Sequence, residues 1–305
     1  MGKFLWVSDN DLTLGEKQRI HNKNVDQEII NLLEENDLTF IISTGKPIEY
    51  AFQTYLFQLI SMIKVQEKFH LLKKIGLTGS NGALTWLGFD DNNKPLKVIK
   101  FDLEDQEIKK AIKEVNLLTR HLLNTFGKLI KEQINAEVDK ERIVGSVVNV
   151  EKDCATMQMR YLGKKEIGIV RNCSEFGLSK TPKAEEFYNE AIKFIEENNL
   201  NLIKLFKHIN TLDIVPKFNG KSLDKSYPIK KIKNELGEVT VIASGDHSND
   251  LDLFKIADQT IAPLNSHPEI ILNANHISGD LEKGFPFTAL EIVKKVKEIC
   301  QDNKY

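Results

Sequence analysis

Short apolar runs alternate with helix-like patterns near both ends of the chain. Four such runs are predicted to be buried strands, namely residues 4–7 (FLWV), 38–43 (LTFIIS), 239–244 (VTVIAS) and 259–264 (QTIAPL). The segments 24–36 and 249–257, which lie between consecutive runs, have the apolar spacing of amphipathic helices. Strands that alternate with helices are typical of a parallel sheet with helices on both faces, so we expect an α/β fold.

The pattern changes in the middle of the chain, between about residues 84 and 215. A long helical pattern covers 106–135, and stretches such as 142–151 alternate apolar with polar residues. Alternation with a period of two is typical of antiparallel strands that have one wet face. We therefore expect an inserted α+β module of residues 84–215, and a core domain of residues 1–83 and 216–305.

Composition narrows the class of protein. The chain has 305 residues, 41% hydrophobic and 28% charged, with a net charge of −2. These values are typical of a globular protein without the basic bias of a nucleic-acid binder. The most apolar stretch, residues 50–65, is interrupted by polar residues at helical spacing, which favours an amphipathic helix over a membrane span. We expect neither nucleic acid nor a membrane as a partner.

The cysteines and the N-terminus indicate a compartment. Cys154, Cys173 and Cys300 are widely spaced and form no C-x-x-C pattern, which favours free thiols in a reducing environment over a disulfide framework or a zinc ribbon. The apolar run at residues 4–7 is too short for a signal core. We therefore expect a cytoplasmic protein.

Polar residues follow three of the predicted strands. Asp9, Asp11 and Thr13 come after the first strand, residues 43–46 (STGK) end the second, and residues 245–250 (GDHSND) follow the third. Ligands of parallel α/β sheets bind beyond the carboxyl ends of the strands, so these residues are the candidates for a site.

The first of these segments has two carboxylates one residue apart, and such groups repel each other. One interpretation of D-x-D-x-T is a polar loop or a helix N-cap, since Asp and Thr are common in both. The other is a metal site, because a divalent cation makes close carboxylates favourable. The pattern alone leaves both open.

Three lysines, Lys217, Lys221 and Lys225, follow the inserted module. Together with the strand ends they complete the set of groups that phosphoryl transfer to an aspartate requires. One carboxylate attacks phosphorus, and a neighbouring carboxylate transfers the proton. A hydroxyl, a backbone amide and a lysine hold the phosphate oxygens, and Mg²⁺ held by acids neutralises charge.

These segments resemble the motifs of the haloacid dehalogenase (HAD) superfamily of phosphatases, in particular the Cof-like sugar phosphatases with a large α/β cap. Residues 8–14 (SDNDLTL), 40–46 (FIISTGK), 213–222 (DIVPKFNGKS) and 242–250 (IASGDHSND) match its four motifs in order. Residues 76–83 (GLTGSNGA) resemble the segment that leads into the cap. The resemblance implies a HAD-like, Rossmann-like core sheet, with residues 84–215 as an α+β cap that closes over the site and selects the substrate.

The resemblance also implies roles in catalysis. Asp9 is the nucleophile, and Asp11 is the general acid and base. Thr44 and the Gly45 amide bind phosphate, and Lys221 bridges the nucleophile and the phosphate. Lys217 is an alternative for that role with a poorer spacing, and without its context Lys221 is a typical surface lysine.

The resemblance implies a Mg²⁺ site as well. Asp9 and Asp246 are the carboxylate ligands, and Asp11 supplies its backbone carbonyl. Asn249 and Asp250 support the metal side of the site. Calcium, which takes more ligands at longer distances, is expected to inhibit.

Some residues depart from the usual pattern of the family. Leu12, Ser222 and His247 stand where glycine is usual, and Lys46 stands where arginine is usual. Leu12 is the most consequential, because a side chain there can change the dihedral angles of the turn beside the phosphate. In the helix after the second motif, we interpret Tyr55 as a core residue.

The function implied is a Mg²⁺-dependent phosphatase that hydrolyses a small phosphorylated metabolite, a sugar phosphate, through a phospho-aspartate intermediate. The alternatives are a phosphomutase of the same superfamily and a non-catalytic phosphate-sensing protein. The sequence leaves the substrate and the oligomeric state open.

Overall fold

The chain folds into two compact units, residues 1–101 with 224–305 and residues 102–223. The computed structural model describes residues 3–15, 22–46, 48–100, 105–126, 143–150, 154–161, 167–172, 184–207, 211–218, 221–222, 224–279 and 285–302.

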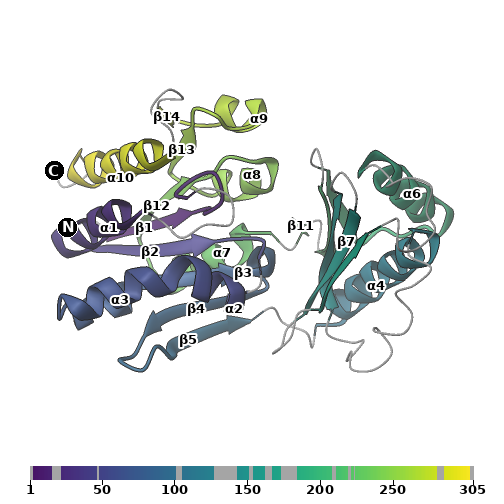
Figure 1. Ribbon diagram of the computed structural model, residues 1–305, viewed down its shortest axis with the longest axis horizontal. Helices are drawn as coiled ribbons and strands as arrows, with labels where there is room; N and C mark the ends of the chain where they lie inside the picture. Colours follow the sequence, from purple (N-terminus) through teal and green to yellow (C-terminus); the bar gives the residue numbers. More distant parts are fainter. Residues whose placement is uncertain are drawn as a thin grey trace. The chain divides into compact units, whose positions relative to one another are not determined.

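The larger unit is built on a sheet that has eight strands within the described residues, in the order β14-β13-β12-β1-β2-β3-β4-β5 (Figure 1). The strands are β1 (Lys3–Ser8), β2 (Leu38–Ser43), β3 (Ile75–Gly79), β4 (Leu84–Phe89), β5 (Pro95–Lys100), β12 (Val239–Ser244), β13 (Gln259–Pro263) and β14 (His276–Ser278). Neighbours from β14 to β3 are parallel, while β4 and β5 continue the sheet as antiparallel strands. The predicted α/β fold with a parallel core sheet is confirmed.

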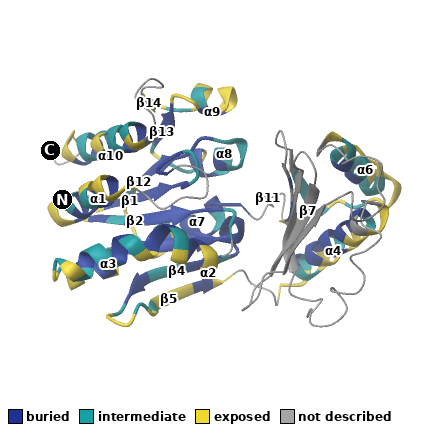
Figure 2. Ribbon diagram, in the orientation of Figure 1, coloured by how far each residue is buried: buried dark blue, intermediate teal, exposed yellow. Residues whose placement is uncertain are grey.

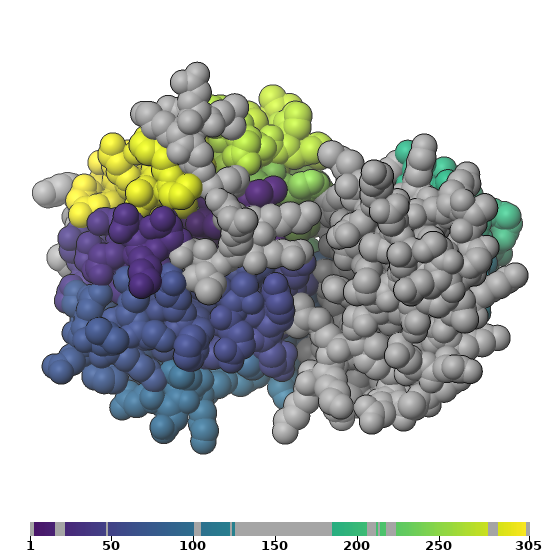
Figure 3. Space-filling view, in the orientation of Figure 1, coloured from purple at the N-terminus to yellow at the C-terminus, as the bar shows by residue number. Residues whose placement is uncertain are grey.

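Helices cover both faces of this sheet. They are α1 (Lys23–Glu35), α2 (Ile48–Ala51), α3 (Phe57–Val65), α7 (Ser226–Leu236), α8 (Leu251–Phe254), α9 (Pro268–Leu272) and α10 (Phe285–Asp302). Side chains of α1, α3 and α10 share one core with one face of the sheet, and side chains of α7, α8 and α9 share a second core with the other. The helices α1 and α10, near the two ends of the chain, lie side by side (Figure 3), and the Lys297 ammonium is 2.7 Å from the carboxylate of Glu35.

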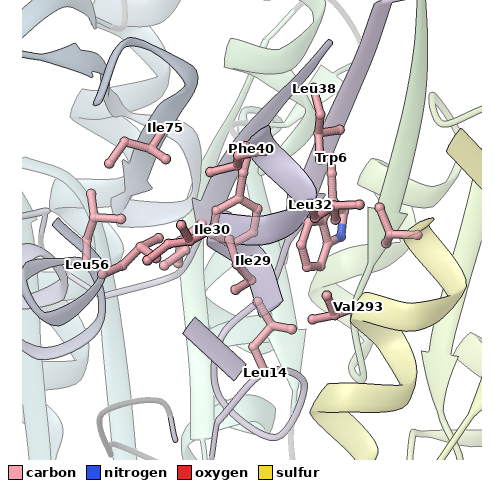
Figure 4. Packing of buried hydrophobic residues seen from close by; sticks show 14 of the residues in the cluster. Trp6, Leu14, Ile29, Ile30, Leu32, Leu38, Phe40, Leu56, Ile75 and Val293 are labelled. Carbon is pink, nitrogen blue, oxygen red and sulfur yellow. The ribbon is translucent and has the colours of Figure 1, made fainter. Parts of the chain in front are cut away.

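The side chains of β1 point alternately to the two faces of the sheet, so both faces need a layer of helices to cover them. Phe4 and Trp6 pack into the core under α1 and α10, whereas Leu5 and Val7 pack into the core under α7 and α8. A strand with both faces covered reads as a continuous apolar run, and the central strands are buried along their length (Figure 2). The Trp6 ring lies 4.5 Å from that of Phe40 on β2, between centroids, within the core of Figure 4.

Within the described residues, the smaller unit consists of an antiparallel sheet and two helices. Its described strands are β6 (Ile143–Val150), β7 (Cys154–Tyr161), β8 (Ile167–Asn172), β9 (Ile203–Lys207), β10 (Thr211–Phe218) and β11 (Lys221–Ser222). Its described helices are α4 (Gln106–Phe126) and α6 (Ala184–Glu197). This is the α+β module expected in the middle of the chain.

The boundaries of the module differ from those predicted. Residues 84–100 form β4 and β5 of the larger sheet, so the smaller unit begins at Asp102 and ends at Leu223. An alternating pattern identifies an antiparallel strand but does not say which sheet the strand joins. Here β4 pairs with β3 directly after a short turn, η3 (Ser80–Gly82), and this local pairing keeps it in the core.

Two predicted helices are shorter in the structure. The helix over 249–257 is a 3₁₀ turn, η5 (Ser248–Asp250), followed by the single turn of α8. The helical pattern over 106–135 corresponds to α4, and residues 127–135 lie outside the described part of the chain. Among the described helices, none is both long and apolar enough to cross a membrane.

Candidate active site

Three loops meet at the carboxyl edge of the central strands. Because β1 lies between β12 and β2 in parallel register, Ser8 pairs with Ser244 on one side and with Ile42 on the other. The chain continues from these strand ends into Asp9, Thr44 and Gly245. The parallel register therefore brings together the polar segments that follow the three strands.

A chain of buried hydrogen bonds fixes the backbone of Asp9. The Trp6 indole Nε1 donates to Ser244 Oγ at 3.0 Å, Ser244 Oγ donates to Ser8 Oγ at 2.7 Å, and Ser8 Oγ donates to the Asp9 carbonyl at 2.7 Å. The Asp9 amide donates to the Ser244 carbonyl at 2.8 Å. The side chains of this network are fully buried and hydrogen-bonded to one another, so they hold the backbone of Asp9 in a fixed position.

Three carboxylates and one ammonium form the centre of the site. Asp9, Asp246 and Asp250 are buried, and one oxygen of each lies within 4.8 Å of the others. Lys225 is 1% exposed; its Nζ donates to Asp9 Oδ1 and, at 2.6 Å, to Asp250 Oδ1. Lys225 directly precedes α7, whose apolar face packs on the sheet and thereby places the lysine beneath the loops.

Among the described residues of this cluster, three carboxyl groups face one ammonium, and their pKa values are shifted accordingly. Burial raises the pKa of Asp9 well above its ordinary value; Lys225 opposes this rise, and Asp250 and Asp246 reinforce it. Burial, reinforced by Asp250, also raises the pKa of Asp246 to about 7. Burial alone would lower the pKa of Lys225, but the carboxylates of Asp250 and Asp9 outweigh it and raise that pKa above its ordinary value.

These carboxylates fit a divalent cation. Burial and mutual repulsion disfavour the ionised form of these acids. A bound cation stabilises the ionised form by adding positive charge between them. Oxygen donors of this kind suit a hard cation such as Mg²⁺.

Asp250 organises the loop that carries Asp246. Its Oδ2 accepts hydrogen bonds from the amides of Asp246 and His247, both at 3.1 Å, while its Oδ1 accepts from Lys225. A Cβ at Gly245 would lie 2.5 Å from Cγ of Asp250, so only glycine leaves room for this arrangement. Asn249 precedes Asp250 in the same 3₁₀ turn.

The loop after β1 makes two further connections. Thr13 Oγ1, which is fully buried, donates to Asp246 Oδ1 at 3.4 Å and links the first motif to the fourth. Asp11 Oδ1 accepts from Tyr55 Oη at 2.9 Å and from Asn10 Nδ2 at 3.2 Å. The interpretation of Tyr55 as a core residue is confirmed, since its ring is buried in the core, and its hydroxyl in addition reaches an acid of the site.

The loop after β2 is tied to the turn before β4. The Thr44 amide donates to the Thr78 carbonyl at 2.9 Å, and the amides of Asn81 and Ser80 donate to the carbonyls of Thr44 and Lys46 at 3.2 and 2.7 Å. Thr44 Oγ1 accepts from the Lys46 amide at 3.2 Å, which leaves its own hydroxyl proton to donate elsewhere. Gly45 lies between these anchored residues.

Leu12 has the backbone conformation that the usual glycine of the family would favour. Its φ is 62°, in the left-handed region, and its amide donates to the Gly15 carbonyl at 2.8 Å. A residue with a Cβ is disfavoured in this region by roughly 1–2 kcal/mol. The turn between Asp11 and Gly15 thus keeps its shape at the expense of local strain.

We expect Leu12→Gly to be more stable than Leu12→Ala by about 1 kcal/mol in the free energy of unfolding. Both variants lose the leucine side chain, but only glycine relieves the left-handed strain. Urea unfolding of the two variants side by side measures the difference. If the alanine variant is as stable as the glycine variant, the left-handed backbone at position 12 is not strained by a Cβ.

The lysine that contacts Asp9 in the structure is Lys225, whereas the resemblance pointed to Lys221. Lys225 belongs to the same compact unit as Asp9 and contacts it, whereas Lys221 lies in β11 of the smaller unit, with its side chain outside the described part of the chain. Lys217, the alternative, lies on β10 of that unit as well. A signal was available: Lys225 is the lysine that directly precedes the amphipathic pattern of residues 226–236.

The sequence pattern of one family, described as haloacid dehalogenase-like hydrolase, matches residues 7–284. Comparison with curated proteins gave no match. Among solved structures, a haloacid dehalogenase-like hydrolase from Bacteroides thetaiotaomicron is 14% identical, with a TM-score of 0.56 over 96% of this chain and 99% of that one. The HAD subclass IIB sugar phosphatase BT4131 is 15% identical, with a TM-score of 0.56 over 97% and 99%.

At these identities the solved structures support the fold, and the family match covers most of the chain. The match spans the loop after β1, the loop after β2, Lys225 and the loop after β12, which are the segments that form the site. The chain therefore belongs to the haloacid dehalogenase-like hydrolases.

Proposed function

We propose that the protein is a phosphatase that hydrolyses a small phosphorylated metabolite through a phospho-aspartate intermediate. The observation that carries the proposal is the position of Asp9, which a buried network fixes at the end of β1 and which contacts the ammonium of Lys225. A carboxylate held in this way is a nucleophile with a cation beside it to receive the phosphate charge.

In the first step an Asp9 oxygen attacks phosphorus, and the bond from phosphorus to the leaving oxygen breaks. Asp11 gives its proton to that oxygen, so the alcohol leaves in neutral form. In the second step water attacks the phosphorus of the aspartyl phosphate and gives a proton to Asp11. The bond between Asp9 and phosphorus then breaks, which releases phosphate and restores both carboxyl groups.

Other residues of the site bind the phosphoryl group. The Lys225 ammonium stabilises the charge on the phosphate oxygens and also holds the carboxylate that attacks. The Thr44 hydroxyl and the Gly45 amide are proposed to donate to phosphate oxygens from the loop after β2. Asp250 keeps Lys225 and the loop of Asp246 in place through its two oxygens.

Asp9, Asp246 and the backbone carbonyl of Asp11 are proposed to hold Mg²⁺, with Asn249 on the same side. When bound there, the cation neutralises phosphate charge so that an anionic carboxylate can approach an anionic ester.

The expected substrates are sugar phosphates. This step beyond the family is supported by the similarity in fold to BT4131, a HAD subclass IIB sugar phosphatase. The residues described above are proposed to bind only the phosphate and the cation, so other residues have to recognise the sugar. We propose that the smaller unit, residues 102–223, supplies them.

The function is tested by phosphate release from a panel of sugar phosphates, nucleotides and an aryl phosphate, each with Mg²⁺. Release from at least one sugar phosphate, together with a phosphoenzyme trapped by acid quench, supports the proposal. Transfer of the group to a second hydroxyl of the substrate, without release of phosphate, would identify a mutase instead.

Removal of the metal is expected to abolish phosphate release, and Mg²⁺ should restore it while Ca²⁺ does not. Binding should also raise the thermal midpoint, by an amount that grows with the ratio of metal concentration to dissociation constant. Asp246→Asn should lose this thermal shift, whereas Asp91→Asn, at an exposed position, should keep it. Full activity after exhaustive chelation would overturn the metal site.

A further inference from the structure

Tyr55 connects the helix after the second motif to the acid of the first motif. It lies in a single π-helical turn, η1 (Phe52–Leu56), between α2 and α3. Its side chain is fully buried, yet Tyr55 Oη donates to Asp11 Oδ1 at 2.9 Å across 44 residues of sequence. A buried phenol needs a hydrogen-bond partner, but a core position does not require that partner to be an acid of the site.

The π-helical turn gives a local reason for this contact. The Phe57 amide donates to the Phe52 carbonyl five residues earlier, so the turn holds one residue more than a regular helical turn. The extra residue changes the direction in which the side chains of the turn point. Turns of this kind recur at functional sites.

We propose that Tyr55 is a positioning residue for Asp11: its hydroxyl donates to Oδ1 and holds the carboxyl group in the orientation in which it exchanges a proton with the leaving group and with water. This inference rests on the proposed phosphatase reaction. It extends that reaction by naming the residue that orients its general acid.

The surroundings of the phenol support this task. Its ring packs edge-on against Tyr50, with 6.2 Å between the ring centroids and 89° between the planes, and the core under α1 and α3 encloses it. This enclosure fixes the ring, and with it the hydroxyl that donates to Asp11.

The test compares two esters that differ in their need for an acid. The alcohol of an alkyl phosphate would leave as an unstable alkoxide unless Asp11 protonates its oxygen. The 4-nitrophenolate of 4-nitrophenyl phosphate is stable enough to leave without a proton. The ratio kcat/KM reports the steps up to loss of the leaving group, so it isolates the acid role. Proton transfer of this kind contributes roughly 10²–10⁴-fold, and a misplaced acid forfeits part of it.

Tyr55→Phe is expected to lower kcat/KM for a sugar phosphate by about 10- to 100-fold, and for 4-nitrophenyl phosphate by less than about threefold. Tyr50→Phe, which removes a hydroxyl from the ring packed against Tyr55, is the matched control and should leave both values unchanged. In an Asp11→Asn background the selective effect of Tyr55→Phe should disappear, because the two groups act as one unit.

An equal loss for both esters, or no loss for either, would overturn the assignment. Thermal unfolding of Tyr55→Phe distinguishes a damaged core from a misplaced acid, since the ring itself is kept. The wild-type protein tests the proposed function by itself, which fails if the protein hydrolyses neither ester. If the wild type hydrolyses both, an unchanged ratio of the two kcat/KM values in Tyr55→Phe refutes only the role of Tyr55.

Discussion

Asp9→Asn is expected to lower phosphate release by about 10⁴-fold or more, to the limit of detection. The amide is a poor nucleophile and a poor ligand for a divalent cation, so the variant loses the attack on phosphorus and weakens the metal site together. The fold should persist, because asparagine has the same shape and lacks the charge whose burial raises the pKa of Asp9.

The measurement is steady-state phosphate release at saturating Mg²⁺, with acid-quench trapping of the phosphoenzyme. No phosphoenzyme should form in the variant. Asp91→Asn, an acid-to-amide change at an exposed position, controls for purification and should behave as the wild type. Phosphate release by Asp9→Asn within tenfold of the wild type would exclude Asp9 as the nucleophile.

The sequence predicts the core sheet well because each central strand has both faces buried. The apolar run that contains Phe4, Leu5, Trp6 and Val7 has no other stable place than the middle of a covered sheet, and the structure puts it there. The pairing of β4 and β5 was not predictable in this way. Residues 84–100 alternate like the strands of the smaller unit, and which sheet they join is decided by the local pairing of β4 with β3.

The candidate site was predictable where chemistry follows a strand directly. Asp9, Thr44 and Asp246 come one or two residues after β1, β2 and β12, so the parallel register alone brings their loops together. The lysine was harder, because it follows no central strand. Its position depends on where α7 begins, and boundaries of helices are poorly defined by sequence patterns.

Tyr55 shows a different limit of sequence reasoning. An apolar helical spacing says correctly that the ring is buried, but the π-helical turn that directs its hydroxyl leaves no pattern in the sequence. Leu12 shows the opposite: the departure from glycine was visible in the sequence, and the structure adds that the left-handed backbone is kept in spite of the side chain.

Lys225→Met is expected to lower phosphate release by about 10³-fold, since it removes the cation that contacts Asp9 and that we propose binds the phosphate. It also leaves the buried carboxylates of Asp9 and Asp250 without their shared partner. Loss of one partner of a buried ion pair costs roughly 3–5 kcal/mol, so the free energy of unfolding should fall as well. Phosphate release and urea unfolding, both with Mg²⁺ present, measure the two effects.

The contrast with Lys221→Met decides which lysine acts. If Lys225 is the catalytic cation, Lys221→Met keeps phosphate release within about threefold of the wild type. A loss of this size corresponds to less than about 1.4 kcal/mol in the activation free energy, which would represent a tenfold loss. Lys225→Arg keeps the charge and serves if the methionine variant fails to fold. We expect it to fold and to remain slower than the wild type, because the planar guanidinium is larger than the ammonium that fits between two carboxylates. Loss of activity in Lys221→Met, with activity retained in Lys225→Arg and Lys225→Met, would mean that the contact between Lys225 and Asp9 is structural and that Lys221 is the phosphate-binding lysine.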